Sequence, residues 1–435
     1  MRHSFEGDFV MAQVGIGLIG WGVVGGGVVD LLTRDRAHIA ARTGMDLEVR
    51  AIVSQPPYKE NTLKAKVGSD IALITGDAAI RVAILLVGGT TVAKDLAIAC
   101  LKAGKHLVTA NKALIASHGD ELFALAKANN VTIAYEAAVA GGIPIIAALR
   151  DGLAANRIDS IHAILNGTCN YILTQMDQKG WSYQQALAEA QRLGYAEADP
   201  TLDVNGTDTA HKLAILARIA YGVAVPIASI RTEGIQNLTT QDLESAKRLR
   251  AKIKLLAVAR RQEHGLELRV APTLVPLDHP LAAVHMNYNG VYVVGSFSGP
   301  QLFTGQGAGA LPTASAVVAD VIDTAIGRTE RTFNQFSFFQ SPNEPRILPE
   351  SEEMTGSYAR FITQDRPGVL AGITQILSTH NVSVLSMYQG EPDGDGHAVI
   401  EVVTHPVRGG AFLAAVATID SRGITAQPTV CYRKL

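Results

Sequence analysis

A glycine-rich segment near the N-terminus places the strongest limit on what this chain can fold into. Residues 20–25 read Gly-Trp-Gly-Val-Val-Gly, between the apolar run 14–19 and a helix-like segment, 25–32. In this context the first glycine permits a tight turn, the second lets the backbone approach a pyrophosphate, and the third lets the helix pack near the strand. A merely structural glycine-rich turn is the alternative. The predicted dinucleotide-binding residues of this segment are Gly20, Gly22, Val23, Val24 and Gly25.

Apolar runs alternate with helix-like segments in the residues that follow. The expected strands are 48–53, 82–87, 107–109 and 131–135, and the expected helices between them are 92–103 and 119–128. Such an alternation indicates βαβ units and a mostly parallel sheet. We therefore expect an open α/β domain of the Rossmann type over residues 12–140.

The pattern changes after residue 140 and predicts a second, α+β domain over 141–310. Helices are expected over 207–220 and 243–259, strands over 266–275 and 290–296, and a capping box between Ser182 and Gln185. Residues 311–334 return to a helical pattern, and we expect them to pack back against the first domain.

The last hundred residues divide into a linker and a small module. Residues 335–357 contain three prolines followed by clustered glutamates, which is typical of a linker. Residues 358–435 show a β-α-β-β-α-β order. The chain is therefore expected to contain two larger domains and one small C-terminal domain.

Composition excludes several classes of partner and compartment. Lys plus Arg is 38 against 40 for Asp plus Glu, a net charge of -2, so no basic excess is available for nucleic acid. Apolar runs such as 143–149 are far shorter than the roughly 18 residues that span a membrane. Three scattered cysteines and an N-terminus without an apolar leader fit a reducing compartment. We expect a cytoplasmic protein that binds neither nucleic acid nor membrane.

The end of the second expected strand bears on the choice of dinucleotide. Residues 53–56 read Val-Ser-Gln-Pro, without the carboxylate that would hold a ribose 2′-hydroxyl, and Lys59 lies close beyond. NADP(H) is therefore favoured and NAD(H) remains possible. Alternatively, Ser54 simply opens a Pro-Pro loop.

Two polar segments follow later strands of the predicted sheet, where ligands bind in open parallel sheets. Thr90 closes the segment 88–90, and Lys112 lies in 109–113. Lys112 could hold a carboxylate or an oxyanion, or it could be a solvated surface lysine. Glu136 precedes the turn 139–144, and a carboxylate followed by carbonyl oxygens suits a hard cation such as sodium or calcium. By chemistry alone, an ordinary interdomain loop is the better explanation.

The most informative cluster lies in residues 194–212. Asp208 and Lys212 are four residues apart, so they share one face of a helix. An exposed salt bridge is the simpler explanation, but the residues that follow Lys212 are strongly apolar, and a buried lysine beside a carboxylate can donate a proton. Glu197 would suit a substrate ammonium, and Asp203 adds a further acid.

Several motifs in order resemble those of the monofunctional bacterial homoserine dehydrogenases over the whole chain beyond the first dozen residues. They are GLIGWGVVG, LVGGT, TANKALIA, YEAAVAGGIPII, NGTCNYIL, GYAEADPTLDVNGTDTAHKLAIL and GQGAGALPTASAVVADVID. The resemblance implies interconversion of L-aspartate 4-semialdehyde and L-homoserine with NAD(P)H, on the route to threonine and methionine. It also implies a ternary complex in the crevice between the domains. In this complex the nicotinamide delivers hydride to the aldehyde carbon.

The same resemblance implies roles for individual residues. Lys212 is the proton donor and Asp208 its partner, while Lys112 lies near nicotinamide and substrate. Glu197 binds the substrate amino group. Thr168, Tyr195 and Asp203 line the pocket, Gly307 and Gly309 form a turn near the cofactor, and Glu136 with the carbonyls of Val139, Gly141 and Ile143 forms a monovalent-cation (Na⁺) site. One departure is Ser54, where many relatives carry a basic residue.

Residues 358–435 resemble an ACT domain, of ferredoxin-like fold, through the segment 363–370, Thr-Gln-Asp-Arg-Pro-Gly-Val-Leu, which opens a helix over 369–378. The resemblance implies pairing across subunits in a homo-oligomer, a dimer or a tetramer, and feedback inhibition, most plausibly by threonine. A purely structural dimerisation module is the alternative.

Two other functions remain open at this point. A non-catalytic amino-acid sensor would keep the dinucleotide and ACT modules and lose the chemistry, but Lys112, Glu197, Asp208 and Lys212 argue against it. A dehydrogenase for a different amino-acid aldehyde would keep all of these residues, and only a panel of substrates separates it from the first hypothesis.

Overall fold

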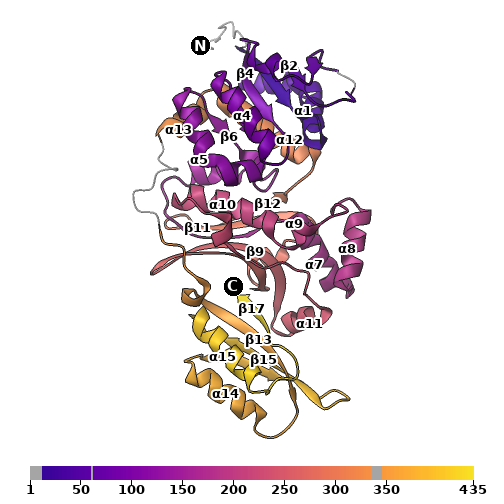
Figure 1. The fold of residues 1–435 in the computed structure, drawn as a ribbon, viewed down its shortest axis with the longest axis vertical. Coiled ribbons are helices and arrows are strands. Elements are labelled where there is room, and N and C mark those ends of the chain that lie inside the picture. The colour runs from indigo at the N-terminus through magenta and orange to yellow at the C-terminus, as the bar shows by residue number, and fades with distance from the viewer. Residues whose placement is uncertain (1–11, 60–61, 336–344) are drawn as a thin grey trace, which may run out of the picture. The chain divides into compact units, whose positions relative to one another are not determined.

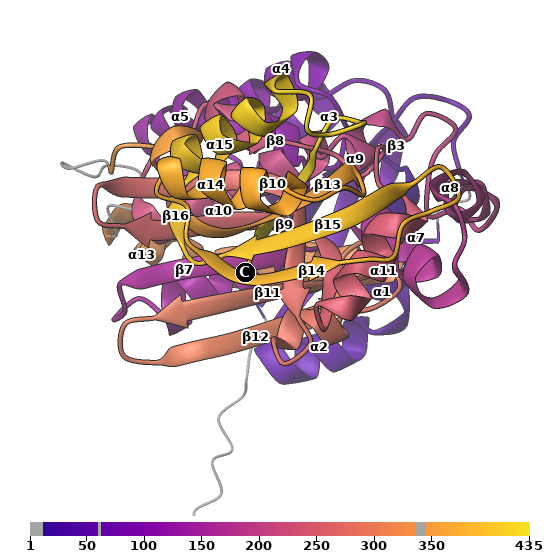
Figure 2. The ribbon, with the colours of Figure 1, turned by 90° about the horizontal axis from the view of Figure 1, so that it is seen from below.

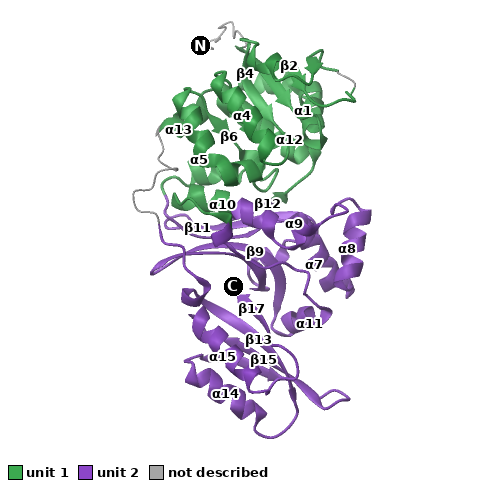
Figure 3. Ribbon diagram, in the orientation of Figure 1, with its two compact units in different colours: residues 1–155, 214–227, 305–342 green, residues 156–213, 228–304, 343–435 purple. Residues whose placement is uncertain are grey.

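The computed structural model describes residues 12–59, 62–335 and 345–435, which divide into two compact units (Figures 1 and 3). The first unit comprises the described parts of 1–155, 214–227 and 305–342. The second unit comprises the described parts of 156–213, 228–304 and 343–435.

The first unit is built on a six-stranded sheet in the order β3-β2-β1-β4-β5-β6, with every pair parallel. This is the order of a doubly wound dinucleotide-binding fold, in which the crevice for a ligand lies where β1 and β4 diverge. The predicted Rossmann-type sheet is therefore confirmed, and β3 is an addition to it. The strands are β1 (Ala12–Ile19), β2 (Met45–Val53), β3 (Lys66–Gly68), β4 (Ile80–Leu85), β5 (His106–Thr109) and β6 (Ile133–Ala134).

Helices of the first unit cover this sheet and bury its apolar strands. The helix over Ala310–Ala325, α12, packs on α1, and Ile16, Leu18, Val28 and Val317 meet in one core. The segment 311–334 thus lies in the first unit, far in sequence from its sheet. The helices are α1 (Val23–Arg34), α2 (Arg36–Thr43), α3 (Ala72–Thr75), α4 (Thr91–Lys102), α5 (Lys112–Ala128), η1 (Glu136–Ala138), α6 (Ile145–Ala147), η2 (Ala148–Gly152), α12 and α13 (Arg328–Gln335).

The second unit contains one continuous sheet in the order β12-β11-β7-β9-β10-β17-β13-β15-β14. The C-terminal strand β17 joins its two halves, because it pairs in parallel with β10 and antiparallel with β13. Two short strands, β8 (Arg231–Thr232) and β16 (Val407–Arg408), pair with β10 and β13. The long strands are β7 (Ile158–Ile164), β9 (Ala251–Gln262), β10 (Gly265–Pro276), β11 (Tyr288–Gly295), β12 (Gly299–Gln306), β13 (Met354–Gln364), β14 (Val384–Gln389), β15 (His397–Thr404) and β17 (Val430–Lys434).

One expected helix of the second unit is wrong. Residues 243–259 were expected to be helical, but α11 (Thr240–Arg248) ends where Arg250 adopts a φ of 54°, and β9 follows it. The physical reason is tertiary, because β9 pairs antiparallel with β10 along its whole length. The expected strands at 266–275 and 290–296 are confirmed as β10 and β11.

The remaining helices include the predicted capping box. Ser182 accepts from the Gln185 N–H and the Gln185 side chain accepts from the Ser182 N–H, at the start of α8. The elements are α7 (Gly167–Lys179), α8 (Tyr183–Arg192), α9 (Thr201–Val204), α10 (Thr207–Tyr221), η3 (Ile227–Ser229), η4 (Pro280–Ala283) and η5 (Glu350–Glu352).

The C-terminal half of this sheet has the predicted β-α-β-β-α-β order. Helices α14 (Val369–Thr379) and α15 (Gly409–Ser421) lie on one face of β13, β15 and β14, over a core that includes Phe361, Ile373 and Phe412 (Figure 2). Strand β13 begins at Met354, four residues before the expected boundary. The centre of the expected linker, 336–344, lies outside the described residues.

Within the described residues, no single helix has the length and apolarity to cross a bilayer. Only the bent pair α12 and α13 meets both criteria together, by length and composition.

Candidate functional site

The glycine turn after β1 has the shape that a pyrophosphate site requires. Gly20 has a φ of 95°, and a Cβ on Gly25 would lie 2.2 Å from the Gly20 carbonyl oxygen. A Cβ on Gly22, in contrast, would meet no atom within 4 Å. Helix α1 begins at Val23 without a side-chain cap, so its first N–H groups can donate to an anion. The turn thus needs Gly25 for folding and leaves Gly22 open towards a ligand.

This contrast predicts different effects for two substitutions. We expect Gly22→Ala to leave thermal unfolding nearly unchanged and to raise the KM for the reduced dinucleotide roughly 10-fold or more, because its methyl group occupies the space of the phosphates. We expect Gly25→Ala to lower the stability of the fold by about 2 kcal/mol or more, because the Gly20 carbonyl must move. Calorimetry and cofactor titration measure both. Equal destabilisation by the two substitutions would refute this distinction.

Asn111 joins the backbone segments that follow β4 and β5. Its Oδ1 accepts from the Leu114 N–H at 3.0 Å and caps α5, while its Nδ2 donates to the carbonyls of Val87 at 2.9 Å and Gly89 at 2.6 Å. The adjacent Lys112 begins α5 and is half-buried, and Thr90 precedes α4. The predicted residues Thr90 and Lys112 therefore lie at the carboxyl edge of the sheet, as expected.

Two further features bear on cofactor binding. Lys59 donates to the Gly22 carbonyl at 3.2 Å, so the loop after β2 folds back onto the glycine turn. Gly309 has a φ of 126° and immediately precedes α12. A Cβ on Gly27 of α1 would lie 2.5 Å from the carbonyl oxygen of Ala310, the first residue of α12. The start of α12 therefore lies against α1, next to the glycine motif.

The carboxylate of Glu136 accepts hydrogen bonds from two backbone amides. Its two oxygens accept from the N–H groups of Ile146 and Ala147, each at 2.8 Å, and its own N–H donates to Asp320 at 2.8 Å. Burial raises the pKa of Glu136 to about 7 and also raises the pKa of Asp320. Among the described residues, no group of three or more His, Cys, Asp or Glu side chains could hold a metal.

The turn after Glu136 contains two consecutive residues with left-handed backbone conformation. Ala140 and Gly141 have φ values of 55° and 53°, and the Gly307 carbonyl oxygen lies 2.5 Å from where a Cβ of Gly141 would be. Two consecutive left-handed residues redirect the carbonyls of the turn that contains Val139, Gly141 and Ile143. Gly307 packs against this turn.

In the second unit, Lys212 lies in a nearly buried ion pair. Its Nζ donates to Asp208 Oδ2 and to the Leu165 carbonyl, each at 2.7 Å. The side chains of Lys212 and Asp208 are 12% and 8% exposed, which distinguishes the pair from a solvated surface salt bridge. The expectation that both residues share one face of a helix is confirmed in α10.

Asn166 joins this pair to a second carboxylate. Its Nδ2 donates to Asp203 at 2.8 Å and to Asp208 at 3.0 Å, and its Oδ1 caps α7 by accepting from the Cys169 N–H. Burial, and then the nearby Asp208, raises the pKa of Asp203. The amide therefore holds two carboxylates that would otherwise repel each other.

The loop that contains Tyr195 and Glu197 is anchored to α7. Thr168 donates to the Tyr195 carbonyl at 2.6 Å, and the ring centroids of Tyr171 and Tyr195 are 4.9 Å apart. The Glu197 carboxylate is exposed and makes no hydrogen bond or ion pair with any described residue. Among the predicted substrate residues, Asp203 is joined to the Lys212–Asp208 pair by Asn166. Thr168 contacts Tyr195. Glu197 remains free to bind a cation.

Comparison with known proteins identifies the family. Family models match three regions: "Homoserine dehydrogenase, NAD binding domain" at 20–136, "Homoserine dehydrogenase" at 144–322 and "ACT domain" at 357–420. The homoserine dehydrogenase of Pseudomonas aeruginosa is 44% identical over 429 residues, covering 97% of this chain and 99% of that protein. The chain belongs to the homoserine dehydrogenase family. It is accordingly an NAD(P)-dependent oxidoreductase.

Other relatives of this family extend the likeness to structure. The Bacillus subtilis homoserine dehydrogenase is 35% identical, covering 97% of this chain and 98% of that protein. A crystal structure of a homoserine dehydrogenase from Thiobacillus denitrificans has a TM-score of 0.91 at 41% identity, with 98% and 99% of the two chains covered. A hyperthermophilic archaeal homoserine dehydrogenase mutant in complex with NADPH has a TM-score of 0.61 at 26% identity, covering 72% of this chain and 98% of that one.

Three residues were given no catalytic or binding role from the sequence. Asn166 and Asn170 lie in the segment 166–171, which by itself indicates a turn with several donors at a capped helix start, and Lys254 lies in the segment wrongly expected to be helical. Lys254 donates to Asn170 Oδ1 at 2.9 Å and to the Val284 carbonyl at 2.6 Å, while Asn170 donates to the Tyr288 carbonyl. Lys254 thus fixes the second turn of α7 behind Asn166.

The titration of Lys254 predicts a pH dependence of stability. Burial lowers its pKa to about 7, so between about pH 7 and its ordinary value near 10.5 the unfolded chain binds more protons than the folded one. Stability contributed by this group therefore rises as pH rises through that window. We expect the unfolding free energy of Lys254→Met, measured in urea, to rise less with pH than that of the wild type. Lys102→Met, at an exposed position of α4, is the control, and identical slopes for Lys254→Met and wild type would contradict the assignment.

Proposed function

We propose that this chain reduces L-aspartate 4-semialdehyde to L-homoserine with NAD(P)H, and catalyses the reverse oxidation. The observation that supports this reaction most strongly is the Lys212–Asp208 pair, nearly buried and joined through Asn166 to Asp203. A desolvated ammonium held by a carboxylate is suited to protonate an oxygen on which negative charge develops.

The described residues of the first unit fit a dinucleotide. The space beside Gly22 and the uncapped start of α1 offer room and N–H donors for the pyrophosphate, and Lys59 offers positive charge for a 2′-phosphate. Bound NAD(P)H supplies the hydride that reaches the aldehyde carbon. Lys112, at the carboxyl edge of the same sheet, contributes positive charge for the substrate or for the developing oxyanion.

The remaining roles belong to the second unit. Lys212 donates its proton to the aldehyde oxygen as the carbon accepts hydride, and Asp208 keeps the ammonium oriented. The exposed Glu197 carboxylate binds the substrate ammonium, and Thr168 positions the loop of Tyr195 and Glu197 through the Tyr195 carbonyl. Asp203 lines the pocket. Holding the amino end fixes the aldehyde near its reaction partners.

Loss of NADPH absorbance with L-aspartate 4-semialdehyde tests the activity. We expect turnover with this aldehyde and much slower turnover with the semialdehydes of longer amino acids. A chain that binds NADPH but turns over none of them would be a non-catalytic sensor, and faster turnover with another aldehyde would make it a dehydrogenase of that compound. Either result overturns the proposal.

We propose a preference for NADP(H) in which Lys59 meets the 2′-phosphate. We expect Lys59→Met to raise the KM for NADPH roughly 3- to 10-fold and to leave that for NADH unchanged, which is the scale of one exposed ion pair. Lys66→Met, on the exposed edge strand β3, is the control. Equal changes for NADPH and NADH would contradict a role in reading the phosphate.

We also propose a structural Na⁺ site at the turn after Glu136. The left-handed Ala140 and Gly141 support it, because they redirect backbone carbonyls, the ligands that a hard cation prefers. Glu136 would contribute its carbonyl oxygen, since its carboxylate accepts from two amides, together with the carbonyls of Val139, Gly141 and Ile143. Thermal unfolding in sodium and in choline chloride tests the site, and equal melting temperatures would exclude it.

Regulation by threonine through the ACT domain is the last part of the proposal, in a homo-oligomer, a dimer or a tetramer. The match of residues 357–420 to the ACT family supports it. Steady-state kinetics with and without threonine test the regulation, and light scattering tests the oligomeric state. Unchanged rates at saturating threonine would leave the module a purely structural dimerisation domain.

A further inference from the structure

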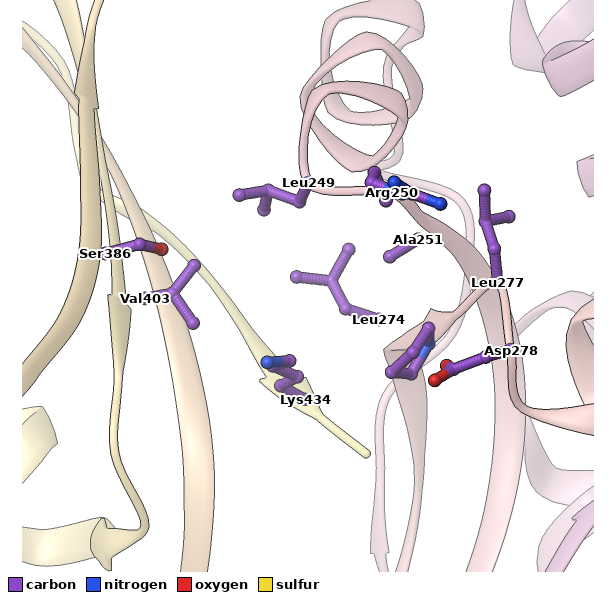
Figure 4. A pocket seen from close by; sticks show the side chains of 10 residues that line it. Leu249, Arg250, Ala251, Leu274, Leu277, Asp278, Ser386, Val403 and Lys434 are labelled. Atoms are coloured by element: carbon purple, nitrogen blue, oxygen red, sulfur yellow. The ribbon is translucent and has the colours of Figure 1, made fainter.

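A cavity of about 310 Å³ opens inside the second unit, on the face of the ACT strands opposite α14 and α15 (Figure 4). Ser386 of β14 and Val403 of β15 form one wall. The opposite wall is formed by 249–251, where α11 turns into β9, and by 274–278, where β10 ends. A volume of roughly 300 Å³ is the lower end of what small-molecule sites offer.

The lining of this cavity combines an apolar floor with charges of both signs. Figure 4 shows Val403 and Leu274 pointing towards each other, and both side chains are buried. Asp278 and Lys434 lie beside them, and neither makes an ion pair with any described residue. A bulge in β14 next to Ser386 adds a hydroxyl to the wall.

These groups match the chemistry of a small α-amino acid. An ammonium suits the Asp278 carboxylate, a carboxylate suits the Lys434 ammonium, and a short side chain suits the surface of Leu274 and Val403. Arg250 adds a second positive charge to the lining. The cavity is therefore suited to a short zwitterion.

The same two strands also hold α11, through residues that lie two positions along each strand from Val403 and Ser386. On β15, Glu401 pairs with Arg248, and on β14 the Tyr388 ring centroid is 5.4 Å from the Arg248 guanidinium. Arg360 on β13 donates to Asp242, at the start of α11, at 2.7 Å in a buried pair. A ligand against Ser386 and Val403 thus touches the two strands that hold the C-terminal end of α11, and β13, which holds its start, pairs directly with β15.

Helix α11 in turn packs against α7, whose first turn begins next to Asn166. Asn166 holds Asp203 and Asp208, and Asp208 holds Lys212. A continuous set of packed elements, all within the second unit, therefore leads from the cavity to the proton donor.

We propose that this cavity binds a small α-amino acid and that its occupancy acts on the site of Lys212 through α11. The inference deepens the regulation proposed above and rests on it, because it names where the effector binds. The turn over 365–368, which opens α14, is the competing location.

Isothermal titration of the full-length protein with L-threonine, L-serine and L-valine tests the site, with D-threonine as the ligand control. We expect Asp278→Asn and Lys434→Gln each to weaken binding roughly 10- to 100-fold, the scale of one charged hydrogen bond. We expect Ser386→Trp, which fills the cavity, to abolish binding and inhibition. Glu391→Gln and Arg422→Gln, at exposed positions outside the cavity, should bind as the wild type does. Uninhibited turnover should be unchanged in all five variants.

Wild-type affinity in Asp278→Asn, Lys434→Gln and Ser386→Trp would overturn the inference, as would loss of binding in Asp365→Asn alone. Absence of binding of all three L-amino acids by the wild type would overturn it too. Failure of the proposed dehydrogenase activity is a separate result, since NADPH-dependent reduction of the semialdehyde is measured on the same wild-type preparation without effector.

Discussion

Lys212→Ala should lower kcat for semialdehyde reduction by roughly 10²- to 10⁴-fold, the usual contribution of a general acid. The Lys212 ammonium lies 2.7 Å from Asp208 in a pair that is nearly inaccessible to water, so solvent cannot easily replace the proton it gives. The KM for the semialdehyde should change much less, because Glu197 is untouched. Steady-state kinetics with saturating NADPH measure both constants.

A loss of stability must be separated from this loss of catalysis. Removal of Lys212 alone leaves Asp208 nearly buried without its cation, which costs several kcal/mol in other proteins. The double variant Asp208→Asn/Lys212→Met removes both charges, and we expect its melting temperature to approach that of the wild type while kcat stays low. A kcat within about threefold of the wild type in Lys212→Ala, below the smallest usual contribution of a general acid, would exclude Lys212 as the proton donor.

Asn166→Asp should be the next most damaging change, with kcat/KM lowered roughly 10- to 100-fold at neutral pH. The new side chain keeps an oxygen that can cap α7. It replaces the Nδ2 donor between Asp203 and Asp208 with an oxygen, and so places a third carboxylate beside these two. Like charges at this distance raise the pKa of at least one member of the group.

Two comparisons make the Asn166 prediction specific. Asn166→Ser keeps an oxygen that can cap the helix without adding charge, so its loss should be smaller. The deficit of Asn166→Asp relative to the wild type should shrink as pH falls, because a protonated carboxyl can again donate to a neighbouring carboxylate. A deficit that is constant from acidic to alkaline pH would contradict the bridging role of the Asn166 amide.

Local patterns were sufficient to predict five of the six strands of the first sheet, all except β3. These strands are short apolar runs bounded by glycine or polar residues, and Ile16, Leu18 and Ile84 are fully buried. The segment 251–259 was mistaken for part of a helix because an apolar run buried on both faces has no clear period. Only pairing with β10 decides that it is a strand, and such pairing is non-local.

The same distinction applies to the site. Asp208 and Lys212 are one helical turn apart, so their pairing could be predicted from spacing alone. Asn166 reaches Asp203 and Asp208 across 37 and 42 residues, and Lys254 reaches Asn170 across 84. No local pattern encodes these contacts. The motif that contains Asn166 was recognised, but the bridging role of its amide required the fold.

Chemical rescue tests the central claim, that Lys212 gives the proton to the aldehyde oxygen, most directly. The rate of NADPH oxidation by Lys212→Ala is measured with L-aspartate 4-semialdehyde and rising concentrations of methylammonium, beside the wild type under the same conditions. The account predicts that the amine restores part of the variant's lost rate in a saturable manner and leaves the wild type unchanged. A variant rate that does not respond to the amine at any concentration would contradict it.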